Sequence, residues 1–178
     1  MTLTQYKKLI KSLSREELEE HLFALFKDNK TFKDIESSSW SEDDNTAMVE
    51  ELQKKLGKVF WKESFSLGEC KGVLKEALSR TVKTDAKALM HLAFASEAVE
   101  LSAAYGDFGE AFYNAMEKSA EEFLKYCKTD KDFFEKHEDE FEKIIKTADP
   151  IGYGITDDLG YMLEDVREDL GYYDDEDE

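Results

Sequence analysis

The chain has little of what interrupts helices or marks an oxidising compartment. Its 178 residues include a single proline and two cysteines, Cys70 and Cys127. Proline breaks helix interiors, so its scarcity beside abundant Glu, Lys, Leu and Ala favours helix. The two cysteines are isolated thiols without metal-ligand spacing, which fits a reducing cytosol.

Positive charge is also scarce. The chain carries 24 Lys and Arg against 42 Asp and Glu, a net charge of −18. This excess argues against direct binding to nucleic acid or to an anionic membrane, because both are negative. The imbalance is uneven: residues 53–87 sum to +5, whereas residues 149–178 sum to −11.

The apolar content is sufficient for one packed domain. The sequence is 41% hydrophobic and 12% aromatic, which excludes global disorder. Its first residues, MTLTQYKKLI, lack the apolar core and the cleavage site of a signal peptide. We therefore expect a cytoplasmic protein with a single all-helical domain over residues 1–171. An acidic tail over residues 172–178 is predicted to be disordered.

The central element is predicted over residues 85–105. A helix turns by about 100° per residue, and here it presents two bulky apolar faces roughly 160° apart. These faces are Leu89, Leu92 and Val99 on one side, and Met90, Phe94 and Leu101 on the other. Only a helix sandwiched between two other layers needs both faces.

Similar apolar stripes before and after this helix predict seven to eight antiparallel helices joined by short loops. No stretch alternates with period two, so the fold class is all-α. Residues 31–36 are expected to add a turn or two of helix, and the polar residues 37–45 (SSSWSEDDN) are expected to form a loop. We favour a solenoid-like helical array because the central helix needs partners on both sides. A closed helical bundle is the alternative.

The sequence contains no recognisable catalytic constellation. It has no Gly-x-Ser-x-Gly elbow and no phosphate-cradling glycine loop. His21, His91 and His137 lie within or beside apolar stripes and are interpreted as partly buried. None has a glutamate three residues before it, which excludes the di-iron pattern. We predict no catalytic residue, no cofactor and no metal.

Two acidic pairs have both a functional and a structural interpretation. Glu97 and Glu100 lie on one side of the central helix, where paired carboxylates could hold a cation or act as acid and base. Their structural interpretation is a solvated stripe at the edge of the covering layer. Asp157 and Asp158 either stabilise the start of the last helix or hold a basic side chain of a partner.

Two segments carry a resemblance to a known family. Tyr105-Gly106-Asp107 followed by Phe112-Tyr113, and Gly152-Tyr153-Gly154 followed by Asp157-Asp158-Leu159, resemble a bacterial family known as domain of unknown function 6155. The start LSREEL at residues 13–18 is also similar. The chain departs from the family at residues 109–111 and at Thr156, where a histidine is expected. The family has no assigned activity, so the resemblance implies the fold and leaves the function open.

These observations favour a non-enzymatic, cytoplasmic helical module that binds an unidentified protein. Its candidate partner-binding residues are Trp40, Tyr153, Asp157 and Asp158. The first alternative is a metal-dependent or hydrolytic enzyme built on a carboxylate cluster, and the second is an acidic mimic of nucleic acid. A pocket that gathers those carboxylates with His91 would favour the enzyme, whereas a concave helical face would favour the module. The oligomeric state stays open.

Overall fold

The computed structural model describes residues 1–173, except for the side chains of residues 42–44. These residues form nine helices and no strand: α1 (Leu3–Ser12), α2 (Arg15–Asp28), α3 (Lys30–Trp40), α4 (Glu42–Phe60), α5 (Leu67–Leu78), α6 (Thr84–Tyr105), α7 (Glu110–Cys127), α8 (Lys131–Ala148) and α9 (Ile155–Asp169). The all-α helical array is confirmed, with nine helices rather than seven to eight. None of these helices combines the length and the apolar character needed to cross a bilayer.

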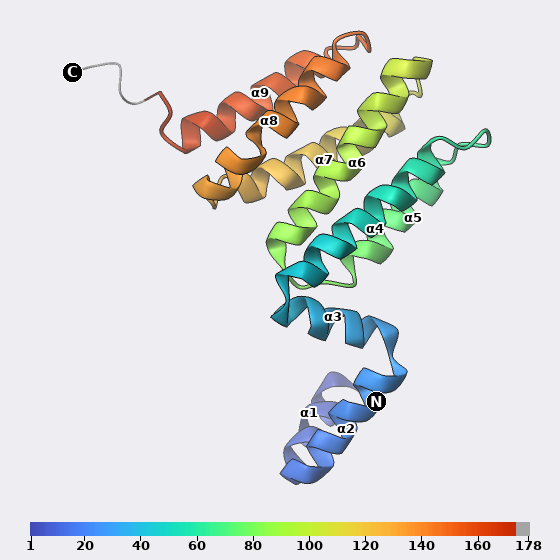
Figure 1. Cartoon of the computed structure of the whole chain (residues 1–178), viewed down its shortest axis with the longest axis vertical. Helices are drawn as coiled ribbons and strands as arrows, with labels where there is room; N and C mark the ends of the chain where they lie inside the picture. The colour runs from blue at the N-terminus through green and yellow to red at the C-terminus, as the bar shows by residue number, and fades with distance from the viewer. Residues whose placement is uncertain (174–178) are drawn as a thin grey trace.

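The helices form a body and a projecting arm. Helices α4 to α9 make the body, and α3 leads down to α1 and α2, which stand away from it (Figure 1). Within the body, α6 is central because α4, α5, α7 and α8 all pack against it, while α9 packs on α7 and α8. From α4 to α9, successive helices run antiparallel, as their short loops predict (Figure 1).

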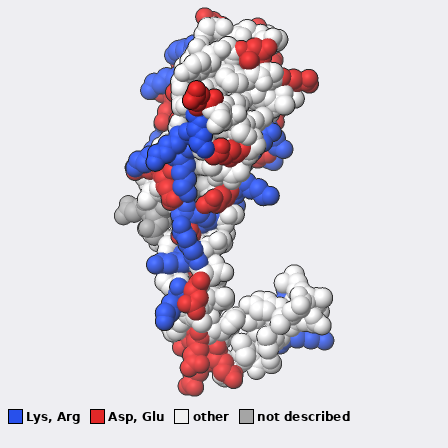
Figure 2. Space-filling view, turned by 90° about the vertical axis from the view of Figure 1, so that its right-hand side faces the viewer, with Lys and Arg blue, Asp and Glu red and all other residues white. Residues whose placement is uncertain are grey.

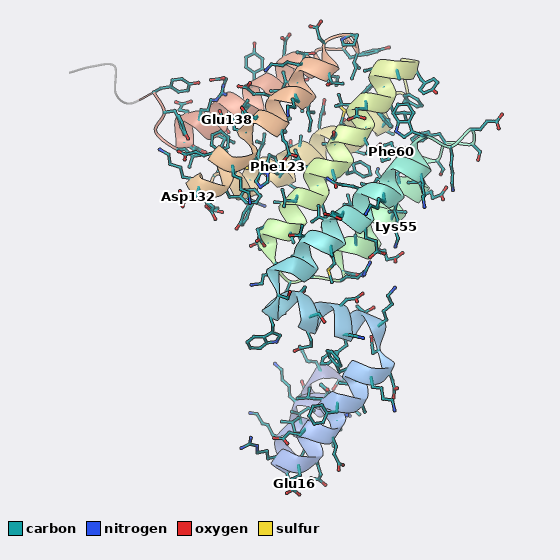
Figure 3. All side chains as sticks on the ribbon, viewed as in Figure 1. Glu16, Lys55, Phe60, Phe123, Asp132 and Glu138 are labelled. Atoms are coloured by element: carbon teal, nitrogen blue, oxygen red, sulfur yellow. The ribbon has the colours of Figure 1, made fainter. Side chains whose placement is uncertain are left out.

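The two apolar faces of α6 account for its central place. Leu92 and Val99 are buried on one face, and Met90, Phe94 and Leu101 are buried on the other. On the side of α4, Phe94 meets Phe60 edge-to-face, with their ring centroids 5.2 Å apart. Phe60 and Phe123 mark the aromatic core on either side of α6 (Figure 3). The expectation of a helix packed on both sides is therefore confirmed.

The stretch predicted as a loop, residues 37–45, is helical except for Ser41. The hydroxyls of Ser38 and Ser39 donate hydrogen bonds to the carbonyl of Ile35, at 2.9 and 2.7 Å. The buried side chain of Asn45 donates to the Ser38 carbonyl at 2.9 Å. The two serines bond to their own helix without interrupting it, and Asn45 of α4 bonds back to α3, so the loop prediction is wrong. These residues form the end of α3 and the start of α4.

The first residues of the predicted tail lie against the body. The hydroxyl of Tyr172 donates to Glu135 at 2.9 Å, and its ring meets Phe134 edge-to-face at 5.8 Å. The hydroxyl of Tyr173 donates to Glu164. Residues 174–178, the rest of the predicted tail, lie outside the described residues.

The basic segment, residues 53–87, covers parts of α4 and α5 and the start of α6. Figure 2 shows a band of Lys and Arg side chains with acidic side chains among them. Several of these lysines are paired: Lys55 lies 3.0 Å from Glu51, and Lys62 forms an ion pair with Glu69. Mixed charge therefore covers this face of an otherwise acidic protein.

Candidate interaction groove

A groove of about 340 Å³ lies on the body between α4 and α8, with α6 as its floor. We call it the α6 groove. Its lining residues come from three helices: Val49 and Gln53 of α4; Leu89, Leu92, Ala93, Ser96, Val99 and Glu100 of α6; and His137, Glu140, Lys143, Ile144 and Thr147 of α8. The groove thus joins segments that are far apart in the sequence.

The groove lies over one of the two apolar faces of α6. Leu89, Leu92 and Val99, which form that predicted face, all line it. Helices α4 and α8 both pack on α6 and cover this face from its two sides. The small side chains of Ala93 and Ser96 form part of the floor of the groove. Leu92 and Val99 are buried beneath α4 and α8, so the groove is a local gap in a second layer that otherwise covers α6.

The rim of the groove is polar. The Ser96 hydroxyl donates to Glu100 at 3.3 Å. On the opposite wall, Nδ1 of His137 lies 3.0 Å from Oε2 of Glu140, and Lys143 lies one turn further along α8. An apolar floor with a hydrogen-bonding rim is the usual composition of a site that binds another molecule.

Glu97 and Glu100 occupy different environments although they lie one turn apart. Glu97 is half-buried and accepts a hydrogen bond from Nε1 of Trp61 at 2.9 Å. Burial raises the pKa of Glu97, the charge of Glu100 raises it further, and the Trp61 bond opposes both effects. Glu100 is exposed at the rim of the groove. The pair is close enough to interact but does not line one common site.

The two aspartates that begin α9 also point to different neighbours. Asp157 lines a hollow between α8 and α9 together with Arg167. Asp158 lies near Glu117 of α7: burial raises the pKa of Glu117, and the negative charge of Asp158 adds to this rise. Both aspartates lie in the first turn of the helix, where negative charge is stabilising.

The two segments that carry the family resemblance meet in space. The hydroxyl of Tyr153 donates to Oδ2 of Asp107 at 2.9 Å, and its ring centroid lies 5.6 Å from that of Tyr113. Tyr153 has a left-handed backbone, with φ of 55°, between Gly152 and Gly154 with φ of 77° each. This turn holds the tyrosine over the loop between α6 and α7.

The candidate partner-binding residues do not form one surface. Trp40 ends α3 and is 86% exposed, whereas Tyr153 is 73% exposed in the turn between α8 and α9. These two places lie at opposite ends of the body (Figure 1). The hydroxyl of Tyr153 is hydrogen-bonded to Asp107, and Asp157 and Asp158 lie in the first turn of α9.

The carboxylates of the enzyme alternative are also dispersed. Glu100, Asp157 and His91 line three different hollows. Among the described residues, no three His, Cys, Asp or Glu side chains are grouped so that they could hold a metal ion. Both cysteines are buried, and burial raises the pKa of Cys70 to about 11 and that of Cys127 to about 12. Such thiols carry very little of the nucleophilic thiolate at neutral pH.

Sequence reasoning identified the floor of the α6 groove but missed its walls. Leu89, Leu92 and Val99 stood out by their spacing, whereas His137 and Lys143 gave no sign that they face α6. Comparison with models of known protein families, with curated proteins and with solved structures finds no match. The resemblance to domain of unknown function 6155 therefore stays a prediction.

Proposed function

We propose that the protein is a non-enzymatic helical module that binds another protein through the α6 groove. One observation carries this proposal: a groove of about 340 Å³, with apolar residues of the central helix on its floor, lies between α4 and α8. Leu89 and Ala93 lie along this floor, with Gln53 and Lys143 on the two walls. We also propose that the protein acts in the cytoplasm.

The shape and chemistry of the α6 groove suit an amphipathic helix. Such a helix places its apolar side in a groove through anchors three or four residues apart. Ala93 and Ser96 leave room on the floor for one or two apolar anchors of the ligand. Glu100 and Glu140 on the rim favour a ligand with Lys or Arg beside those anchors.

The alternatives receive less support. The carboxylates of the enzyme reading, Glu97, Glu100, Asp157 and Asp158, lie in separate environments. A nucleic-acid mimic requires a continuous negative face, and the one face shown in Figure 2 does not meet this requirement because it mixes both charges. The dispersed carboxylates and the mixed surface both favour the protein-binding module.

The proposal is tested by filling the groove. Amphipathic helical peptides are selected from a displayed library on the full-length protein, and their affinities are measured by fluorescence anisotropy. Ser96→Trp places an indole over the floor, and we expect it to weaken the selected peptides by about tenfold or more. Ser64→Trp, an exposed position before α5, is the matched control and should bind as the wild type does. If selected peptides bind Ser96→Trp as tightly as the wild type, the groove is not the binding surface.

A further inference from the structure

Helices α1 and α2 are ordered but contribute nothing to the core. Neither contains a buried residue, and they project away from the body below α3 (Figure 1). Their exposed large apolar side chains are Leu3, Tyr6, Leu9, Leu22, Phe23 and Phe26. Apolar surface of this extent on a small element marks an interaction site.

The contact between α1 and α2 is slight. The hydroxyl of Tyr6 lies 3.4 Å from Nε2 of His21. Ile10, Leu18 and Leu25 remain only half-buried along the seam. The two helices therefore form one apolar layer. Helix α3 packs on α2, and Nζ of Lys33 lies 5.7 Å from the centroid of the Phe26 ring, but Leu3, Leu9 and Phe23 remain exposed.

The charges of this layer are opposite on its two helices. Helix α1 carries three lysines and no acidic residue, a net charge of +3. Helix α2 carries five acidic residues against Arg15 and Lys27, a net charge of −3. Residues 1–29 are fully described, and their one ion pair joins Arg15 to Glu19 within α2. The lysines of α1 and most carboxylates of α2 are thus available to a second chain.

We propose that α1 and α2 pack on the same two helices of a second copy and form a four-helix bundle between two chains. A two-fold axis lays α1 of each chain on α2 of the other, because an isologous interface uses the same patch on both copies. This arrangement covers the apolar layers and places the +3 helix on the −3 helix twice. Helices α1 and α2 contain 10 and 14 residues, so the sides that face the partner make an interface smaller than the roughly 20–30 residues per side of a standard one.

This inference is independent of the proposed function. The α6 groove is formed by α4, α6 and α8, whereas the bundle would use only α1 and α2. A dimer joined through the arm therefore leaves both grooves free. Filling the groove with Ser96→Trp should not change the dimer, so the two proposals fail separately.

The first test measures the mass of the full-length protein in solution. Sedimentation velocity over a range of micromolar concentrations should show twice the mass of one chain. Leu22→Glu with Phe23→Glu should raise the dissociation constant by about 100-fold or more, because two apolar contacts are replaced by charges. Tyr161→Glu is the matched control, since Tyr161 and Phe23 are both 72% exposed. Circular dichroism checks that each variant keeps its helices.

The second test exchanges the charges. One variant carries Lys7→Glu, Lys8→Glu and Lys11→Glu, and the other carries Glu16→Lys, Glu19→Lys and Glu20→Lys. Glu16 lies at the outer end of α2 (Figure 3). Each variant alone should dissociate, because α1 and α2 then have the same sign. An equimolar mixture should dimerise again, since a negative α1 then meets a positive α2 in one contact and a positive α1 meets a negative α2 in the other.

The restored dimer should weaken with added salt. A monomeric wild type would overturn the proposal and assign the apolar layer to a different protein. A wild-type dimer that Leu22→Glu with Phe23→Glu leaves unchanged would also overturn it, because the contact would then lie elsewhere. Failure of the mixed charge variants to associate would overturn the two-fold arrangement.

Discussion

Arg80, in the loop between α5 and α6, ties α3 to the body. Its Nε donates to Oδ2 of Asp34 in α3 at 2.6 Å, and its Nη1 donates to Oε2 of Glu51 in α4 at 2.9 Å. The side chains of Arg80 and Asp34 are only 13% and 17% exposed. Arg80→Met keeps most of the aliphatic stem and removes the cation, which leaves Asp34 without a charged partner.

The cost of this substitution follows from the two bonds. A hydrogen bond to a charged group contributes about 1.5–3 kcal/mol when it is shielded from water. The Asp34 bond meets this condition. Glu51 is 40% exposed and retains Lys55 at 3.0 Å, so its bond contributes less. We expect a total of about 2–4 kcal/mol, lost at the junction of α3 with α4.

Hydrogen exchange of the backbone amides is the appropriate assay because the loss is local. A loss of about 2 kcal/mol raises the opening equilibrium roughly 30-fold, so the amides of α3 should exchange about that much faster in Arg80→Met. The amides of α6 should change little, since buried apolar side chains hold that helix. Equal exchange of α3 in the wild type and in Arg80→Met would refute the reasoning.

Two further measurements make this result specific. Lys146→Met removes the exposed pair with Glu142, whose members lie 3.0 Å apart, and such pairs contribute about 0–1 kcal/mol. It should leave α3 unchanged. Asp34→Asn should accelerate α3 exchange in the wild type but much less in Arg80→Met, because the two substitutions break one interaction.

Three other predictions concern the body. Phe60→Ala should lower the free energy of unfolding by about 3–5 kcal/mol in urea, because a fully buried ring is lost; an unchanged midpoint would contradict its core position. Gly154→Ala should destabilise by about 1 kcal/mol or more, since its φ is 77°, whereas Gly160→Ala, inside α9 with free space, should stabilise. Burial raises the pKa of Glu97. The protonated carboxyl is therefore favoured in the folded protein, and this contribution to stability is lost as pH rises through the raised pKa. Glu97→Gln should therefore be more stable than the wild type at neutral pH, with the gain vanishing below about pH 4; an equal gain at both pH values would contradict this assignment.

Apolar stripes predicted most of the helices, and the structure shows that several of them also begin at local capping residues. The box formed by Ser14 and Glu17 starts α2, and the side chain of Asp130 accepts the amide of Phe133 at the start of α8. Both depend on residues three positions apart. The loop prediction for residues 37–45 failed because the helical state of this stretch depends partly on a contact with a distant residue. The Thr81 hydroxyl donates to Asn45 at 3.1 Å across 36 residues.

The candidate site shows the same division. The spacing of Glu97 and Glu100 placed them on one side of a helix, but only packing set Trp61 against Glu97. Asp107 and Tyr153 belong to the two separate segments that carry the family resemblance. The hydrogen bond that joins them is 2.9 Å long and spans 46 residues. A local sequence pattern does not indicate which distant residue a side chain will contact in the folded protein.

The sequence by itself determined which segments are helical and which of their sides are apolar, because periodicity and caps act over a few residues. It also determined the opposite charges of α1 and α2. Only the tertiary structure decided which apolar sides are covered. The side of α6 that carries Leu89 is covered by α4 and α8 except along the groove between them. The apolar layer of α1 and α2 stays open because α3 carries it away from the body (Figure 1).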